Sequence, residues 1–87
     1  MTILSRTAQL IRDLREMRVI TDEDQYSYVS KGEGKIKLTI NIRTRIAGAH
    51  EEALYTILDA IVTEFSKEII RNDVFNFGMI QVILKEL

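Results

Sequence analysis

Apolar and polar side chains alternate along residues 35–46 of this chain. The apolar positions are Ile36, Leu38, Ile40, Ile42 and Ile46. The polar positions include Lys35, Lys37, Thr39, Asn41, Arg43 and Arg45. Because successive side chains of a β-strand point to opposite faces, the pattern predicts one strand with an apolar face and a basic face.

Two other stretches repeat apolar residues at helical spacing. In the first, residues 3–18, one stripe includes Ile3 and Leu14, and Thr2 is placed to cap the helix N-terminus. In the second, residues 49–71, the apolar stripe is wide. Its members are Leu54, Tyr55, Ile57, Leu58, Ile61, Val62, Phe65 and Ile69. The spacing predicts two amphipathic helices, of which the second is the longer.

A glycine-containing segment, residues 31–34, separates a short strand predicted at residues 25–30 from the alternating strand. Glycines accept positive φ, so this segment predicts a β-hairpin. A three-residue loop would set Tyr28 opposite Leu38 and place it, with Tyr26, on the apolar face. A two- or four-residue loop would place both tyrosines among the lysines. We favour the three-residue loop, because it leaves the polar residues next to the tyrosines exposed.

After the second helix, Asn72 is a suitable left-handed terminator, and residues 74–84 are apolar on both faces. We expect one last strand there, parallel to residues 35–46, because a long helix joins the two. The element order is then α-β-β-α-β. The expected fold is α+β, one small domain over residues 1–87, with a three-stranded mixed sheet and two helices packed on one face.

The composition narrows the functional classes. The 87 residues contain no cysteine, which excludes disulfides and cysteine-based zinc sites. Twelve basic and thirteen acidic side chains give a net charge of −1, unlike the basic balance of a general nucleic-acid binder. The first residues lack the pattern of a secretory signal, and no stretch reaches the roughly 18 apolar residues of a membrane span. We expect a cytoplasmic protein.

The sequence offers no catalytic or metal-binding pattern. His50 is the only histidine, and position 54, where a helical zinc motif needs a second one, is Leu54. We expect His50 to be exposed in the first turn of the second helix. The acidic run at residues 22–24 lacks the ligand spacing of a calcium loop and is expected to be a solvated connection. We therefore expect a non-enzymatic protein without a cofactor or metal.

A strand that ends in arginines and leads through a glycine into a helix is a candidate anion site. Arg43, Arg45 and Gly48 form this junction, and the free N–H groups of the helix start favour negative charge. Glu51 and Glu52 weaken the site, because their carboxylates already occupy the first turn. A small-anion sensor is our third hypothesis for function.

The basic face of residues 35–46 has three interpretations. It is a solvated surface, a protein-binding surface or a nucleic-acid site. In the last case Tyr26 and Tyr28 would stack bases beside the cations. The residues of this candidate site are Lys35, Lys37, Arg43, Arg45, Tyr26 and Tyr28. A nucleic-acid-binding module is our second hypothesis.

The chain carries more apolar surface than a domain of this size is expected to bury, mostly on the long helix and last strand. The candidate self-association residues are Tyr55, Val62, Ile69, Ile70, Phe75 and Phe77. Our leading hypothesis is a non-enzymatic interaction or assembly module, a homodimer or larger, that contacts an unidentified partner protein. Small inhibitory proteins of viruses and mobile elements belong to this class. The loop lacks the GxxG of a KH domain, and no strand has the aromatic signature of an RRM.

Overall fold

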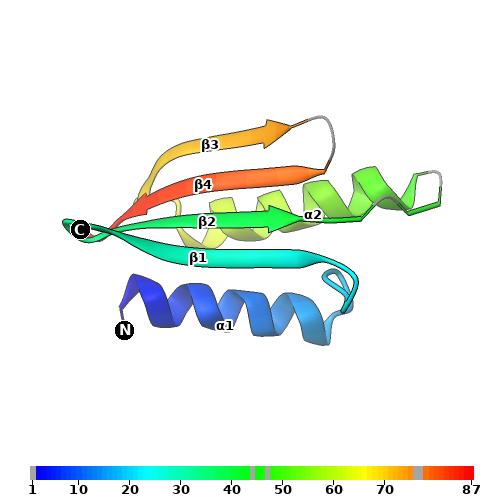
Figure 1. Ribbon diagram of the computed structural model, residues 1–87, viewed down its shortest axis with the longest axis horizontal. Coiled ribbons are helices and arrows are strands. Elements are labelled where there is room, and N and C mark those ends of the chain that lie inside the picture. Colours follow the sequence, from blue (N-terminus) through cyan, green and yellow to red (C-terminus); the bar gives the residue numbers. More distant parts are fainter. Residues whose placement is uncertain (1, 44, 47, 76–77) are drawn as a thin grey trace.

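The structure, a computed structural model, describes residues 2–43, 45–46, 48–75 and 78–87. This described part contains two helices and four strands in the order α-β-β-α-β-β (Figure 1). Their bounds are α1 (Ile3–Glu16), β1 (Gln25–Gly32), β2 (Lys35–Asn41), α2 (Ala49–Glu64), β3 (Ile69–Phe75) and β4 (Met79–Lys85). The predicted α+β class with two helices is confirmed, but the chain ends in two strands rather than one.

The strands form one antiparallel sheet in the order β1-β2-β4-β3. β2 pairs with both β1 and β4, and β4 pairs with β3. The expected three-stranded mixed sheet is therefore wrong in strand number and in strand direction. α2 does join two strands that run the same way, β2 and β3, but β4 lies between them. β4 runs antiparallel to both β2 and β3 and fills that position.

The predicted helix of residues 49–71 ends early, at Glu64. Phe65 keeps the helical spacing and is buried, but its backbone leaves helical geometry, with φ −118° and ψ 30°. The N–H of Ile69 still donates to the carbonyl of Phe65 at 3.1 Å, so the helical spacing continues beyond the helix. Asn72, expected to terminate the helix, lies inside β3. Periodicity alone therefore extends the helix too far.

The predicted last strand, residues 74–84, is divided at Gly78. This glycine has a φ of 85°, and a Cβ there would lie 2.7 Å from Cε1 of His50 and 2.8 Å from the carbonyl oxygen of Ile42. The Gly78 carbonyl accepts a hydrogen bond from the Ile42 N–H at 3.0 Å. Only glycine fits this backbone conformation and close approach without displacement. The chain therefore enters β4 at Gly78, inside the segment expected to be one strand.

The core lies between the helices and one face of the sheet. The apolar side chains of β2 are buried, as the alternation predicts, and pair with the buried side chains of β4. The buried apolar residues are Ile3, Ile11, Leu14, Ile20, Ile36, Leu38, Ile40, Ile42, Ile57, Ile61, Phe65, Ile80, Val82 and Leu84. Figure 1 shows α2 behind β2 and β4 and α1 along β1, whereas β3 lies at the edge of the sheet away from α1.

The β1–β2 hairpin has the register that we favour from the sequence. Tyr26 and Tyr28 lie opposite buried residues of β2, on the side of the sheet that faces the helices. The loop reaches this register in a different way from the one expected. Glu33 and Gly34, with φ values of 56° and 73°, form a two-residue turn, and a bulge at Lys31 supplies the extra residue.

Candidate interaction surfaces

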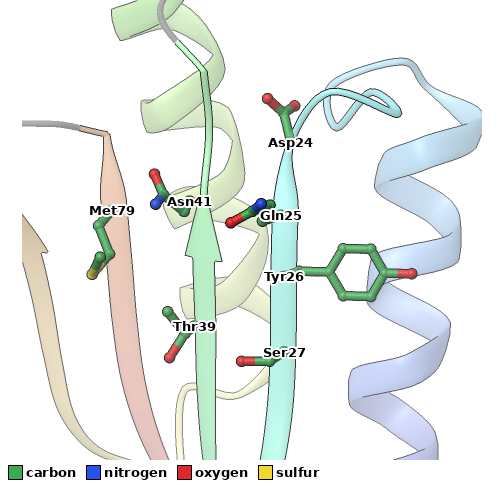
Figure 2. Close-up of a pocket in the computed structure, with 7 residues that line it drawn as sticks. All are labelled: Asp24, Gln25, Tyr26, Ser27, Thr39, Asn41 and Met79. Atoms are coloured by element: carbon green, nitrogen blue, oxygen red, sulfur yellow. The ribbon is translucent and has the colours of Figure 1, made fainter.

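The open face of the sheet, which points away from the helices, is mostly polar. A shallow hollow of about 560 Å³ lies over β1, β2 and the start of β4. It is lined by Asp24, Gln25, Tyr26, Ser27, Thr39, Asn41 and Met79. Figure 2 shows Gln25, Thr39 and Asn41 over the sheet, while Tyr26 points toward α1. The amide and hydroxyl groups offer hydrogen bonds, but the hollow is a broad surface rather than an enclosed ligand site.

Lys35 and Lys37 lie at one end of this open face. Lys35 pairs with Lys85 of β4, and Lys37 pairs with Ile83. Arg71 of β3 lies on the other side of Ile83, so four basic residues share this end of the open face. The sequence did not indicate Lys85 and Arg71, because their positions depend on the pairing of β4 with both of its neighbours.

Arg43 and Arg45 follow the opposite end of β2 and belong to a separate cluster around Asp24. The carboxylate of Asp24 accepts hydrogen bonds from the N–H groups of Thr21 and Arg43, both at 2.9 Å, and pairs with Arg45. Arg45 also donates to the carbonyl of Val19 at 3.3 Å. Burial disfavours ionisation of Asp24, but these hydrogen bonds and Arg45 outweigh burial and lower the pKa of Asp24 below its ordinary value.

The candidate anion site therefore loses one of its two expected cations, because the guanidinium group of Arg45 already pairs with Asp24. Thr44 and Ala47 of the same junction lie outside the described residues. Among the described residues of the junction, Arg43 is the exposed cation. Glu51 and Glu52 lie in the first turn of α2, as expected. The junction offers an incoming anion less positive charge than the sequence suggests.

Tyr26 and Tyr28 line a groove between α1 and β1. The groove has a volume of about 310 Å³, and Arg15 of α1 forms part of its wall. Arg15 donates a hydrogen bond to the Tyr26 hydroxyl at 3.3 Å. The structure thus separates the two tyrosines from the lysines of β2, which lie on the other face of the sheet. Base stacking on the open face would need them together.

His50 is half-buried rather than exposed as expected. Its ring lies beside Gly78, and its Nδ1 is 3.4 Å from the carbonyl oxygen of Arg43. Within the described residues, no group of three or more histidine, aspartate or glutamate side chains could hold a metal ion. No described helix is long and apolar enough to cross a membrane. His50 contributes to packing where the chain enters β4.

An apolar surface remains exposed on α2 and β3. We call it the α2–β3 surface, and it consists of Tyr55, Val62, Ile70 and Val74. Their exposed fractions are 69, 40, 53 and 50%, respectively. Among the described residues, the remaining exposed large apolar side chains lie on other elements or outside the helices and strands. They are Leu4, Met17, Tyr26, Val29, Ile46 and Leu87.

The two halves of the α2–β3 surface face the same side of the molecule. On the side near α1, α2 presents Glu64, whose carboxylate pairs with Arg6 of α1 at 3.0 Å. Val62 lies on the other side of α2, because two residues correspond to a rotation of about 200°. Tyr55, seven residues earlier, shares that side. The sheet order and Figure 1 place α1 beside β1 and β3 at the opposite edge, so Val62 and Tyr55 lie on the side of α2 that is turned toward the β3 edge.

β3 also has a free edge. It pairs with β4, and no other described segment pairs with it. Val74 lies opposite the buried Ile80 and so shares the helix-facing side, yet it is half exposed, and Figure 1 shows the far end of β3 curving away from α2. Comparison with protein-family models, curated proteins and solved structures gives no match for this chain. Its function is therefore argued from its surfaces.

The structure changes the set of candidate self-association residues. Ile69 is half-buried and packs against the core rather than lying at the surface. The side chain of Phe75 and the whole of Phe77 lie outside the described residues. Val74 is a new member of the set. The place of Val74 follows from the pairing of β3 with β4, and the prediction of a helix through residue 71 conceals the start of that strand.

Proposed function

We propose that this protein is a non-enzymatic interaction module that assembles with copies of itself through the α2–β3 surface. The observation that carries this proposal is the combination of a free strand edge with exposed apolar side chains on both β3 and α2. A free edge offers unpaired N–H and C=O groups to another strand. Exposed apolar side chains beside such an edge favour association, because burying the exposed half of each gains about 0.8–1.5 kcal/mol.

The two alternative functions have weaker support. Nucleic-acid binding rests on the basic end of the open face, but Arg43 and Arg45 lie at the other end of β2 and the tyrosines face α1. An anion sensor rests on the strand-to-helix junction, where Arg45 is already paired with Asp24. Self-association requires only the side chains that are exposed in the structure.

The proposal is tested by measuring the mass of the protein in solution over a concentration series, by light scattering or sedimentation. A monomer has a mass of 10.1 kDa, and we expect the native chain to exceed it. Val74→Asp places a charge on the β3 edge and should give a folded monomer. Val29→Asp is the matched control, because Val29 lies on the other edge strand, β1, and is exposed to a similar extent, 55% against 50%.

Circular dichroism separates loss of assembly from loss of folding. Both substitutions replace half-exposed side chains, so both variants should keep the native spectrum. A native chain that stays monomeric at the highest concentration would contradict the proposed function. Equal loss of assembly in Val74→Asp and Val29→Asp would also contradict the assignment to the α2–β3 surface.

A further inference from the structure

The exposed part of β3 is complementary to itself. Asn72 lies at its centre, with Arg71 and Asp73 on either side and the apolar residues Ile70 and Val74 outside them. In an antiparallel pair of identical strands centred on Asn72, Arg71 of each copy lies opposite Asp73 of the other. Ile70, the bulge residue of β3, then lies next to Val74 of the other copy. The same arrangement therefore matches charge to charge and apolar group to apolar group.

The structure places these residues on suitable faces of the sheet. Arg71 and Asp73 pair with Ile83 and Gln81 of β4, so both charges lie on the open face. Asn72 and Val74 pair with buried residues of β4 and lie on the helix-facing side. Directly opposed residues of neighbouring strands share a face. Two paired copies would thus have charge pairs on the open face and the Val74 side chains on the helix-facing side.

We infer that two copies of this chain pair through β3 in antiparallel register, with Asn72 on the two-fold axis. The two four-stranded sheets then form one continuous sheet, in which β3 is no longer an edge. This inference rests on the proposed self-association and adds its geometry. Val62 and Tyr55 of each copy flank the seam on the helix side, where they extend the apolar contact made by Ile70 and Val74.

The charges favour the pairing centred on Asn72 over pairings centred on the residue before or after it. Within one chain, Nε of Arg71 lies 2.8 Å from Oδ2 of Asp73, and the two side chains are 72 and 37% exposed. Such an exposed pair contributes little within a monomer. In the inferred dimer each carboxylate also faces the partner's guanidinium group. Centring the pair on Arg71 or on Asp73 instead would set like charges opposite each other, which is unfavourable.

The test reverses each of the two charges in a separate variant and then mixes the two variants. Arg71→Asp gives two acidic residues on β3, and Asp73→Arg gives two basic ones. Each variant alone sets like charges across the two-fold axis, so its self-association should weaken about tenfold or more. An equimolar mixture should recover association as a heterodimer, which native mass spectrometry identifies by its mass. Ser27→Asp and Ser27→Arg, on the open face of β1, serve as the charge controls.

Mixing is informative because neither variant can form the original pair within one chain. Recovery in the mixture therefore requires contact between chains. Unchanged association of each variant alone would overturn the β3 pairing and leave the proposed self-association intact. A native chain that is monomeric would overturn both. A preference for the heterodimer in the Ser27 mixture as strong as that in the β3 mixture would also overturn the pairing, because it would show attraction by net charge alone.

A second measurement does not depend on charge. The chain contains no cysteine, so Asn72→Cys introduces a single thiol at the inferred two-fold axis. Directly opposed residues in an antiparallel pair have Cβ atoms about 4.5–5.5 Å apart. A short bis-maleimide reagent should therefore join two Asn72→Cys chains at least tenfold faster than two Ser30→Cys chains. Ser30 is exposed on β1. Equal cross-linking rates would overturn the pairing.

Discussion

β1 and β3 are the two edge strands of one sheet, yet they present different side chains to solvent. Each strand has one bulge, at Lys31 in β1 and at Ile70 in β3. Lysines and bulges are common means of preventing a free edge from pairing with another chain. β1 combines the two, whereas β3 places an isoleucine at its bulge. Both edges carry a bulge, so the difference between them lies in the residue at the bulge, a lysine in β1 and an isoleucine in β3.

The difference does not arise from how firmly the strands are held. β1 begins next to Asp24, which pairs with Arg45. β3 begins next to Glu68, which pairs with Arg6 of α1 at 2.7 Å, and this hydrogen bond lowers the pKa of Glu68. The guanidinium group of Arg6 also lies 4.8 Å from the ring centroid of Phe65. Both strands are anchored by ion pairs, so the contrast lies in their outward side chains.

The largest effect is expected when β3 receives the protecting residue of β1. Ile70→Lys removes a half-exposed isoleucine and puts a charge at the bulge. Each dimer loses two such contacts, and at about 1.5 kcal/mol each the dissociation constant should rise roughly a hundredfold. Sedimentation over a concentration series measures this change. The free energy of unfolding of the monomer should change little, because Ile70 lies outside the core.

Ile70→Leu is the matched control for this substitution. It keeps the apolar volume and should retain association within a few-fold of the native chain. An Ile70→Lys protein that assembles as well as the native chain would contradict the contrast between the two edges. It would show that the bulge of β3 is not part of the contact.

The next effect concerns the anchoring of β1. Asp24→Ala removes the acceptor of two backbone N–H groups and the partner of Arg45. Loss of these interactions should lower the free energy of unfolding by about 2 kcal/mol. Urea denaturation measures this change. Self-association through β3 should persist wherever the variant is folded, because Asp24 lies beside the other edge strand. A variant that loses assembly while it stays folded would contradict this separation.

Acid sensitivity provides a second readout of the same group. The pKa of Asp24 is lower in the folded protein than in the unfolded chain, where it is about 3.9. The stabilisation is therefore complete above the unfolded pKa and is lost as pH falls through the folded pKa. Asp24→Ala should reduce the decline in the free energy of unfolding between about pH 5 and about pH 2. An unchanged decline would show that Asp24 does not couple folding to pH.

The hairpin of β1 and β2 could be predicted because its signals are local. The alternation in residues 35–46 and the glycine-containing turn fix the buried face of β2 and the register of the tyrosines. The end of α2 could not be predicted in this way, since Phe65 and Ile69 keep the helical spacing in a turn. The break at Gly78 could not be predicted from the apolar pattern, because glycine is needed there for a close approach to His50 and Ile42, which lie elsewhere in the chain.

The candidate surface could be predicted in part for the same reason. Tyr55 and Val62 stand out from the helical pattern alone, because they lie on the flank of a wide apolar stripe. Val74 and the self-complementary order around Asn72 indicate a contact surface only when β3 is an edge strand. That property depends on β4 pairing between β2 and β3, which brings together residues far apart in sequence. Local pattern does not decide such pairing.

The smallest effect is expected from the reverse exchange, Lys31→Ile, which gives β1 the bulge residue of β3. The native edge of β1 would then lose its charge and gain an apolar side chain, which favours pairing with another strand. α1 lies along β1 and limits access (Figure 1), so we expect only about a tenfold gain in association through this edge, or about 1.4 kcal/mol. In a dimer joined through β3, the β1 edge of each copy would still be able to pair with a further chain, so light scattering should detect species larger than the native assembly.

Lys31→Gln, which removes the charge without adding an apolar group, is the control and should stay at the native size. If Lys31→Ile also keeps that size, the bulge residue does not decide which edge associates, and the protection of β1 must come from α1.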